Sequence, residues 1–545
     1  MPNRDAPDDP ARRCGSLRAG LRLLALCVVA AAGTIIQGCA SLAPVDKVAS
    51  QAIAARADTR LGAIAARSVP AADETAFRAL PISAFSMDAR LALVQAAQSS
   101  LDLQYYLLQD DATGRTLMRA VRDAALRGVR VRILVDDLYT ADSARVLRDL
   151  AAYDNIEVRL FNPFPAGRAL MLTRWAFSLF DFARVNHRMH NKMLLADGAF
   201  AVAGGRNIAD EYFFRSDQGN FIDFDLLLAG KAVADLAAIF DTYWNSPRVY
   251  PIDALEVLSH DPSALRAEFE QRTRIDDNPF VPPSSEARDM LGYSALSHDL
   301  EHPPLRLLHG AVHVFADDPE KVSGRSENGH DPTTVTAQAV AAFTSATSQL
   351  TLASPYFVPG PIGMEMLRVA RSRNVATTVI TNSLAANDEP FASAAYARYR
   401  KPMLKMGVEV YEISSRLPEL ATHYGARIGG SIGRSHAKVA VADRRITFLG
   451  SMNMDFRSSR TNTELGMLIE STELAEQICG LLEELSATDA FRLSLEQPGD
   501  RLLWTLQKDS AAGGATTVYH DEPDAGFGTR LKILLFSPLV PDGLL

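Results

Sequence analysis

The feature that most constrains this chain is that it contains the same run of secondary structure twice. Residues 100–106 have the composition of a strand, a helical pattern follows to residue 127, and residues 129–135 are again apolar and β-branched. The same order returns from residues 350–356 through a helix to residues 375–381. Strand, helix and strand, with strands apolar on both faces, favour parallel pairing under helical cover. The sequence therefore predicts an α/β fold of two tandem α/β/α domains, each a mixed sheet flanked by helices, joined as a pseudo-two-fold duplication.

The composition is that of a long, apolar and mildly acidic chain. It has 545 residues, 47% of them hydrophobic and 22% charged, which is enough for more than one globular core. The formal net charge of -9 gives no global attraction to a phosphate backbone, so a nucleic acid would need a local basic groove. This balance disfavours a nuclease, and no nucleic-acid partner is expected.

The N-terminus has the layout of a bacterial export signal. Arginines precede an apolar run over residues 23–36, which is short for a membrane span of about 20 residues. The run ends in Ile36-Gln37-Gly38-Cys39, which resembles a lipobox, so Cys39 is expected to become the lipid-modified first residue of the mature protein. A short uncleaved anchor is the alternative. Either interpretation predicts a membrane-anchored protein of the bacterial cell envelope facing the periplasm, and Ala40 after the cysteine favours the outer membrane.

The repeat and the changes in composition divide the chain into six segments. A linker rich in Gly and Ala at 511–515 precedes an apolar tail at 531–545, which fits contact with a membrane and packing onto the body equally well. The expected segments are a signal peptide at 1–39, an N-terminal linker at 40–84, a first domain at 85–255, a connecting segment at 256–304, a second domain at 305–495 and a C-terminal tail at 496–545.

Each copy carries a His-x-Lys-x4-Asp motif at a matching point. A strand over the second motif would place His436 and Lys438 on one face and apolar side chains on the other. A hairpin return after each motif is expected to bring an asparagine, Asn207 or Asn453, back beside the histidine. A single histidine in a strand is usually part of the core, but two complete motifs in one chain indicate a shared chemical role. The motif residues are His190, Lys192 and Asp197 in the first copy and His436, Lys438 and Asp443 in the second.

These motifs are similar to those of the phospholipase D superfamily, and the resemblance extends over nearly the whole mature chain. It implies that the two motifs meet at the interface of the halves and form one active site. One histidine then attacks phosphorus to give a phosphohistidine, and the other protonates the departing alcohol and activates the incoming one. By similarity His190 is the nucleophile and His436 the acid and base, although exchanged roles would leave the reaction unchanged. Imidazole suits both tasks near neutral pH, because its reference pKa is about 6.5.

The resemblance also implies how the phosphate is held. Lys192 and Lys438, together with Asn207 and Asn453, are expected to bind the non-bridging oxygens, where negative charge builds up. No metal or other cofactor is expected, since the sequence has no tight His/Asp/Glu cluster beyond the motifs.

Each catalytic histidine needs a carboxylate to fix its tautomer and to stabilise its charged form. Aligning the stretches that follow the two motifs puts Asp223 and Glu464 at equivalent points, and the family pattern assigns them this role, so that each half has its own carboxylate. Asp225 competes with Asp223, because it lies on the same strand face. Asp197 and Asp443 are expected to order their hairpins rather than to touch substrate.

Local sequence narrows the substrate. Segments at 103–106, 159–164, 381–388 and 396–400 are similar to those of the bacterial cardiolipin synthase C type. This resemblance implies phosphatidyl transfer from phosphatidylethanolamine or phosphatidylglycerol to phosphatidylglycerol at a membrane. The alternatives are a phospholipase D hydrolase that releases phosphatidic acid and a secreted phosphodiesterase or nuclease, since the motif determines the reaction class and not the substrate.

An apolar stretch at residues 170–182 lies just upstream of His190, whereas the corresponding stretch before His436, residues 414–434, is far more polar. An exposed apolar helix beside the catalytic histidine would seat acyl chains or enter the bilayer surface. The alternative is an ordinary buried helix.

Overall fold

The computed structural model describes residue 42 and residues 44–531, apart from 72, 169, 171, 175–177, 179–180, 256–260, 275–278, 324–330, 417–431, 508–515 and 527. The expected signal peptide, the predicted lipid site at Cys39 and all but the first residue of the apolar tail lie outside the described residues. Within the described part of the chain, no helix is both long and apolar enough to cross a bilayer.

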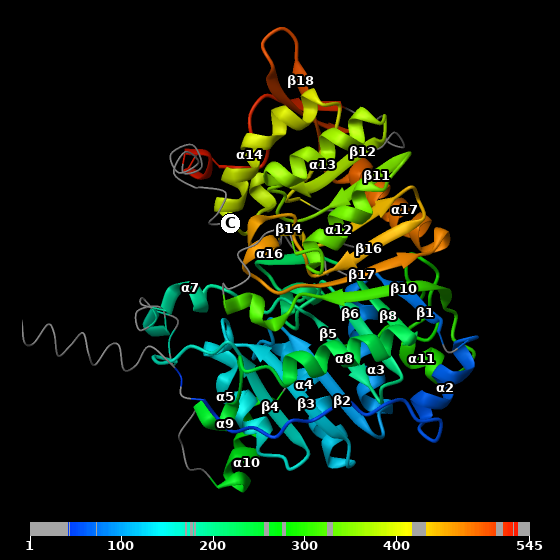
Figure 1. Ribbon diagram of the computed structural model, residues 1–545, viewed down its shortest axis with the longest axis vertical. Coiled ribbons are helices and arrows are strands. Elements are labelled where there is room, and N and C mark those ends of the chain that lie inside the picture. The colour runs from blue at the N-terminus through cyan, green and yellow to red at the C-terminus, as the bar shows by residue number, and fades with distance from the viewer. Residues whose placement is uncertain are drawn as a thin grey trace, which may run out of the picture.

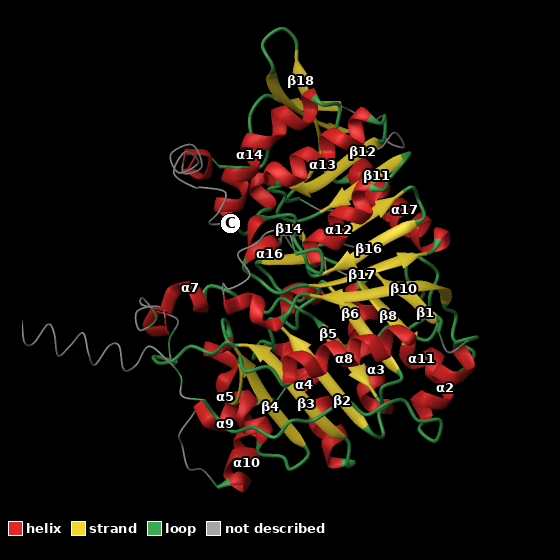
Figure 2. Ribbon diagram, viewed as in Figure 1, coloured by secondary structure: helices red, strands yellow, loops and turns green. Residues whose placement is uncertain are grey.

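A mixed sheet of 18 strands runs through both halves of the chain (Figures 1 and 2). In spatial order, the strands of the first half are β9 (Val249–Pro251), β4 (Ile156–Phe161), β3 (Arg130–Asp136), β2 (Ser100–Tyr105), β5 (Met193–Ala196), β6 (Phe200–Gly204), β8 (Asp225–Gly230) and β1 (Thr75–Leu80). The sheet continues through β10 (Leu308–Ala316), β17 (Leu465–Glu470), β16 (Ile446–Gly450), β15 (Val439–Ala442), β11 (Gln349–Ala353), β12 (Ala376–Asn382), β13 (Glu409–Ile413), β18 (Ala490–Glu496), β19 (Arg501–Gln507) and β20 (Thr516–Tyr519).

The two halves meet where β1 pairs antiparallel with β10, Thr75 opposite Gly310. Outward from this junction the strand order is equivalent in both directions, with β2, β3 and β4 in one half matching β11, β12 and β13 in the other. These two sets of three strands are parallel, as the sequence predicts. The motif-bearing hairpins, β5–β6 and β15–β16, pair antiparallel to β2 and β11. The predicted fold of two tandem α/β/α halves is confirmed.

Helices cover the sheet and fill three large apolar cores. In the first half they are α2 (Arg60–Ser68), α3 (Ser83–Ala96), α4 (Ala112–Leu126), α5 (Thr140–Ala151), α7 (Phe182–Val185), α8 (Lys231–Trp244) and α9 (Ile252–Leu255), with the 3-10 helix η2 (Asp210–Phe213). The connection holds α10 (Pro262–Arg272) and α11 (Leu296–Glu301). The second half has η3 (Pro319–Ser323), α12 (Val335–Thr344), α13 (Gly360–Ser372), η4 (Leu384–Ala386), α14 (Pro390–Lys405), α16 (Phe456–Arg460) and α17 (Thr472–Thr488).

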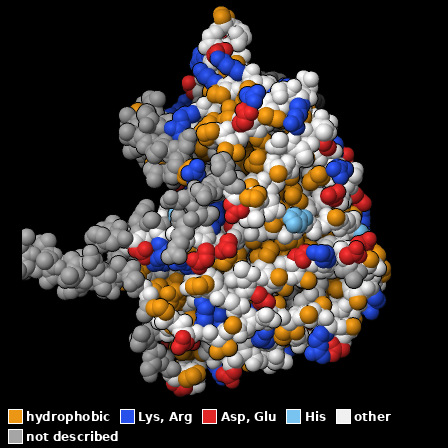
Figure 3. Space-filling model, viewed as in Figure 1, with side chains coloured by type: hydrophobic (Ala, Val, Ile, Leu, Met, Phe, Trp, Pro, Cys, Tyr) orange, Lys and Arg blue, Asp and Glu red, His pale blue; other side chains and the backbone are white. Residues whose placement is uncertain are grey.

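One of these cores joins the halves. It contains Leu236 and Phe240 of α8 together with Ile478 and Leu482 of α17, and it includes buried side chains from strands of both halves. Because a shared apolar core leaves each half with an uncovered face if the other is removed, the halves form one folding body. On the face seen in Figure 3, lysines and arginines are interspersed with aspartates and glutamates, so this face presents no basic stripe.

The segment expected as an N-terminal linker at 40–84 instead contains α2 and the strand β1. β1 is at the centre of the sheet, with β8 on one side and β10 on the other. Its sequence hides this position because Arg78 interrupts the apolar pattern, and that arginine is buried against Asp299 at 2.7 Å. The expected C-terminal tail at 496–545 likewise begins with β19 and β20, which extend the sheet beyond β18.

Candidate active site

Both motifs lie at the entrance of a hairpin, with His and Lys in extended backbone just before the first strand. β5 begins at Met193, directly after Lys192, and β15 begins at Val439, directly after Lys438. The sequence predicts a strand over the whole motif, but the strand begins three residues after the histidine in each copy. The backbone N–H groups of the histidines are bound by the opposite half, His190 to the carbonyl of Thr463 at 2.8 Å and His436 to that of Ile222 at 2.7 Å.

Two short parallel pairings explain this exchange. β14 (Ile432–Ser435), which leads to His436, pairs with β7 (Gly219–Ile222) of the first half. Met189, just before His190, forms a parallel bridge with Thr463 of the second half. The segment that approaches each histidine therefore runs beside the segment that approaches the carboxylate of the other half.

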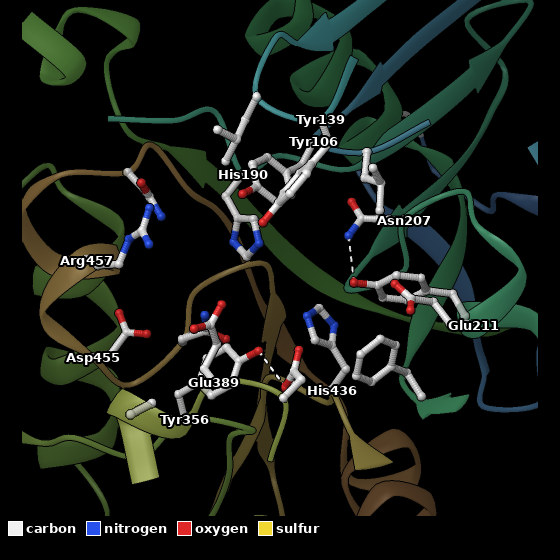
Figure 4. A pocket seen from close by; sticks show the side chains of 18 of the residues that line it. Tyr106, Tyr139, His190, Asn207, Glu211, Tyr356, Glu389, His436, Asp455 and Arg457 are labelled. Carbon is white, nitrogen blue, oxygen red and sulfur yellow. Dashed lines mark hydrogen bonds between the residues drawn. The ribbon is translucent and has the colours of Figure 1, made fainter. Parts of the chain in front are cut away.

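The carboxylates consequently pair across the halves. Glu464 Oε2 is 3.0 Å from Nδ1 of His190, and Asp223 Oδ2 is 2.7 Å from Nδ1 of His436. The expectation that each half keeps its carboxylate for its own histidine is wrong, because the pairing of β7 with β14 places each acid next to the motif of the other half. With both Nδ1 atoms engaged, Nε2 is the ring nitrogen left for chemistry, and both rings line one cavity and point toward each other (Figure 4).

Asp225, the competitor for Asp223, has a different position. β7 ends at Ile222 and β8 begins at Asp225, so Asp223 lies between the two strands and the two acids do not share a strand. Asp225 is buried between Arg90 and Arg206, each 3.1 Å from its carboxylate. It forms a structural ion-pair cluster and makes no contact with His436.

The motif lysines fold back over their own histidines. Lys192 Nζ donates to the carbonyl of His190 at 2.6 Å, and Lys438 Nζ donates to that of His436 at 2.8 Å. Lys438 Nζ also lies 3.0 Å from each ring nitrogen of His436. Both ammonium groups thus lie buried beside the histidines.

The positive groups of the site depress one another's charge. Burial, and then the neighbouring Lys192, lower the pKa of His190 to about 4. Burial followed by Lys438 lowers the pKa of His436 well below its usual value, and burial followed by Lys438 does the same for Lys192. Burial lowers the pKa of Lys438 to about 8. Glu464 and Asp223 oppose this lowering in both lysines, so the site combines buried cations with buried carboxylates.

The two carboxylates differ in their surroundings. Glu464 accepts hydrogen bonds from the hydroxyls of Ser451 and Ser458. Burial alone would raise its pKa, but His190, Lys192 and the hydrogen bond from Ser451 hold the pKa below its usual range. Asp223 accepts from the backbone N–H of Phe224 at 2.8 Å, and burial raises its pKa to about 7.

The residue that follows the first glycine of each hairpin return accounts for part of this difference. The position of Ser451 in the second copy is occupied by Gly205 in the first. A Cβ atom at Gly205 would lie 2.1 Å from Asp223 Oδ1, so only glycine leaves room for that carboxylate.

Asn207 and Asn453 line the cavity beside the histidines, as the hairpin returns predict. Asn207 donates to the hydroxyl of Tyr212 at 2.9 Å, and the buried side-chain oxygens of both asparagines have no hydrogen-bond partner in the described structure. The cavity has a volume of about 660 Å³. The asparagines are therefore in position to contact a phosphate held between the imidazoles.

Asp197 and Asp443 lie away from the cavity and order the hairpins. Asp197 accepts from the backbone N–H groups of residues 98, 99 and 100, which enter β2, and Asp443 accepts from residues 347, 348 and 349, which enter β11. Both aspartates adopt positive φ angles, 53° and 54°, so each makes the tight turn of its hairpin. Their contacts are those of structural residues.

Several cavity residues were not found from the sequence. Tyr106 contacts His190 edge-on, with centroids 5.0 Å apart, and Tyr212 contacts His436 in the same way at 5.1 Å. Tyr106 and Tyr356 occupy matching points of the repeat, and this match was the available signal, since both line the cavity. The counterpart of Tyr106 beside His436 comes from η2 instead and has no such signal.

Acidic side chains also line the cavity, which the sequence did not reveal. They include Glu211, Asp388 and Glu389, and Tyr356 donates to Asp388 at 2.9 Å (Figure 4). Burial and then Asp388 raise the pKa of Glu211 to about 7. Among the described residues, no group of three or more His, Cys, Asp or Glu side chains is arranged to hold a metal ion.

The apolar stretch at 170–182 is described only in part. Leu170 and Leu172 are 63% and 81% exposed, while Arg174 and Ser178 are buried. Trp175, Phe177, Leu179 and Phe180 lie outside the described residues. The described part thus presents two leucines to solvent near the motif.

Two imidazoles that face one cavity from equivalent hairpins, each with a lysine and a buried carboxylate, define a phosphodiester-processing site of the phospholipase D type. The sequence matches the family described as "Cardiolipin synthase, PLD-like domain" over residues 91–244 and 340–485, and the chain belongs to this family. It is accordingly a phospholipase D-type phosphatidyltransferase.

Curated relatives and solved structures agree. The chain is 35% identical over 459 residues to cardiolipin synthase C of Escherichia coli (strain K12), covering 84% of this chain and 93% of that protein. It is 25% identical over 410 residues to cardiolipin synthase 1 of Bacillus anthracis, covering 75% and 66%. The crystal structure of phosphatidylserine synthase from Haemophilus influenzae Rd KW20 superposes with a TM-score of 0.55 at 15% identity, covering 88% of this chain and 95% of that one. This last likeness shows the fold alone.

Proposed function

We propose that this protein is a membrane-tethered cardiolipin synthase that transfers a phosphatidyl group through a phosphohistidine. The observation that carries the proposal is the pair of imidazoles on one cavity, each with Nδ1 bound to a buried carboxylate, which leaves Nε2 as the ring nitrogen for chemistry. In the first step Nε2 of His190 attacks phosphorus, the bond from phosphorus to the head-group oxygen breaks, and His436 gives its proton to that oxygen.

The second step reverses the proton transfer. Neutral His436 takes the proton from a hydroxyl of the acceptor lipid, the acceptor oxygen attacks phosphorus, and the phosphorus–nitrogen bond to His190 breaks. His436 is left protonated for the next turnover. If water enters in place of the lipid alcohol, the product is phosphatidic acid, so exclusion of water from the cavity decides between transfer and hydrolysis.

The assignment of His190 as nucleophile is supported by its carboxylate. Although burial acts against it, His190, Lys192 and the hydroxyl of Ser451 favour the ionised form of Glu464. An ionised partner stabilises the positive ring that forms when Nε2 bonds to phosphorus. Asp223, with its pKa raised by burial to about 7, suits a histidine that gives up and takes back a proton in each cycle.

The lysines support a substrate with one negative charge. A phosphodiester anion beside Lys192 and Lys438 would add negative charge next to both buried ammonium groups, and Asn207 and Asn453 would donate to its oxygens.

The acidic side chains that line the cavity support phosphatidylethanolamine as a donor. Its ammonium group would lie opposite Glu211, Asp388 and Glu389 when its phosphate is between the histidines. Phosphatidylglycerol, whose hydroxyls are both nucleophile and hydrogen-bond donor, is the proposed acceptor and a second donor. The name of the relative in Escherichia coli supports cardiolipin as the product.

The proposed location is the periplasmic side of the bacterial cell envelope, with the outer membrane as the anchoring membrane. Its support is the sequence Ile36-Gln37-Gly38-Cys39 and the alanine that follows. Lipidation of Cys39 would keep the catalytic cavity at the membrane that supplies its substrates.

The test is incubation of purified protein with phosphatidylethanolamine labelled in its acyl chains and unlabelled phosphatidylglycerol in mixed vesicles. Labelled cardiolipin with release of ethanolamine is expected. Labelled phosphatidic acid alone would identify a hydrolase, and degradation of plasmid DNA without lipid turnover would identify a nuclease. His190→Ala and His436→Ala serve as controls, and both are expected to lose turnover.

A further inference from the structure

We propose that an apolar groove in the second half binds one acyl chain of the phospholipid substrate. The groove has a volume of about 460 Å³ and lies between α12, α13 and the segment that follows β16. It is lined by valine, phenylalanine, methionine, isoleucine and proline side chains, including Val340, Phe343, Ile362, Met366, Met454 and Phe456. This inference rests on the proposed function and names the part of the molecule that recognises lipid.

The groove lies beside the catalytic cavity. Asn453 and Asp455 line both spaces, so they share a wall at the point where the second motif hairpin returns. A phosphodiester bound between the imidazoles would contact Asn453, and a chain that leaves its glycerol in that direction would reach the groove on the other side of Asn453 and Asp455. Because the groove lies next to the place of the phosphate, an acyl chain of the substrate is the occupant that fits it.

The rim and the surrounding surface fit an occupant that arrives from a membrane. Ile362, at the start of α13, is 55% exposed, and hydrophobic side chains gather over α12 and α13 on the face shown in Figure 3. The methionines supply soft, adaptable side chains, which suit a flexible hydrocarbon.

The groove is also a departure from the internal symmetry. In the first half the place of α16 is taken by η2, which packs against α3 and α4 with Tyr212 and Phe213 buried. In the second half, α16 leaves the space between itself, α12 and α13 open. The two halves share their catalytic residues but differ at this place. The difference gives the second half a groove for an acyl chain beside the phosphate.

The experiment measures how the consumption of soluble diacyl phosphatidylethanolamines depends on acyl length, below their critical micelle concentrations. Each methylene that enters the groove is worth about fourfold in affinity. In the wild type, kcat/KM is therefore expected to rise with each added carbon pair until the groove is full. Val340→Trp fills the groove and is expected to flatten this rise at least tenfold over the series. The matched control is Val281→Trp, at a valine that is 76% exposed and does not line the groove.

A phosphodiester without acyl chains, methyl p-nitrophenyl phosphate, reports on the catalytic residues separately. Val340→Trp is expected to keep wild-type activity on it. If this variant loses that activity or fails to fold, the chain-length dependence is measured in Ile362→Asp instead. This substitution places a charge at the exposed rim of the groove without adding volume to the core. Equal chain-length slopes in the wild type and Ile362→Asp would overturn the inference.

Failure of the proposed function has a different signature. If the wild type consumes no phospholipid but cleaves the acyl-free ester, the proposed substrate class is wrong. Binding of an acyl chain in the groove is then tested by the rise in melting temperature that the same lipids cause. The inference stands if this rise grows with acyl length in the wild type and does not grow in Val340→Trp.

Discussion

Replacing the two carboxylates by their amides is expected to have very unequal effects, with Asp223→Asn far more damaging than Glu464→Gln. One oxygen of Asp223 accepts from the backbone N–H of Phe224, which can only donate. An asparagine must therefore keep its oxygen there and turn its NH2 group toward Nδ1 of His436. Nδ1 then has to accept, so the ring proton moves to Nε2, and the histidine loses its ability to act as a base.

Glu464 has a different partner on its second oxygen. Ser458 Oγ donates to Oε1 at 2.8 Å, and a hydroxyl can also accept. A glutamine can point its NH2 group at Ser458 and keep its oxygen on Nδ1 of His190. The correct tautomer survives, and what is lost is the negative charge.

The magnitudes follow from these geometries. Forcing the wrong tautomer on a catalytic histidine costs about 10⁴ in kcat. Exchanging a charge-assisted hydrogen bond for a neutral one costs about 1–1.5 kcal/mol, or roughly tenfold. We therefore expect lipid transfer to fall about 10⁴-fold in Asp223→Asn and about tenfold in Glu464→Gln.

A p-nitrophenyl phosphodiester separates the two steps, because its leaving group departs without a proton. If Asp223 serves His436, Asp223→Asn still forms the phosphohistidine on His190 and releases one equivalent of nitrophenolate in a burst. Turnover then stops, and the trapped phosphohistidine is located by acid quench and peptide mapping. Loss of the burst in Asp223→Asn, or equal damage by both substitutions, would refute the crossed assignment. His190→Ala is the control without a burst.

Three further outcomes are expected. Asp225→Asn leaves Arg90 and Arg206 buried without their counter-charge and should lower the free energy of unfolding by roughly 3–5 kcal/mol in denaturant titrations, in contrast to a small effect if the cluster were solvated. Because burial raises the pKa of Glu211 to about 7, this carboxyl is neutral below that pH and charged above it. Between pH 6 and 8, KM for phosphatidylethanolamine should therefore fall, whereas KM for phosphatidylglycerol as donor should not. Glu211→Gln should abolish this difference between the two donors. Tungstate, a phosphate mimic, should raise the melting temperature, and a Lys438→Ala variant with an unreduced shift would contradict a phosphate site beside that lysine.

The fold was predictable because local patterns carry it. Each strand–helix–strand unit has its own apolar periodicity, and the repeat doubles the signal. β1 was missed because its position at the junction depends on the Arg78–Asp299 pair, whose partners are 221 residues apart in sequence. A buried charge paired over that distance makes a central strand resemble a surface segment.

The residues of the site were predictable, but their pairing was not. The two motifs, the asparagines and the equivalent acids follow from aligning the copies. Which acid serves which histidine depends on the pairing of β7 with β14, strands of four residues each from opposite halves. No local pattern specifies such a pairing. The difference between Gly205 in the first copy and Ser451 in the second was the available sign that the two carboxylates have different surroundings.

The crossed pairing gives the duplication a physical consequence. Each histidine takes its backbone hydrogen bond and its carboxylate from the other half, so neither half contains a complete catalytic unit. Errors of about 1 Å in such an arrangement cost on the order of a hundredfold in rate, so the halves must be held rigidly relative to each other. The β1–β10 pairing and the shared core of α8 and α17 provide that rigidity, because they make the sheet and the apolar interior continuous through the junction. Separating the halves would therefore remove the tautomer control of both histidines at once, although every motif residue would still be present.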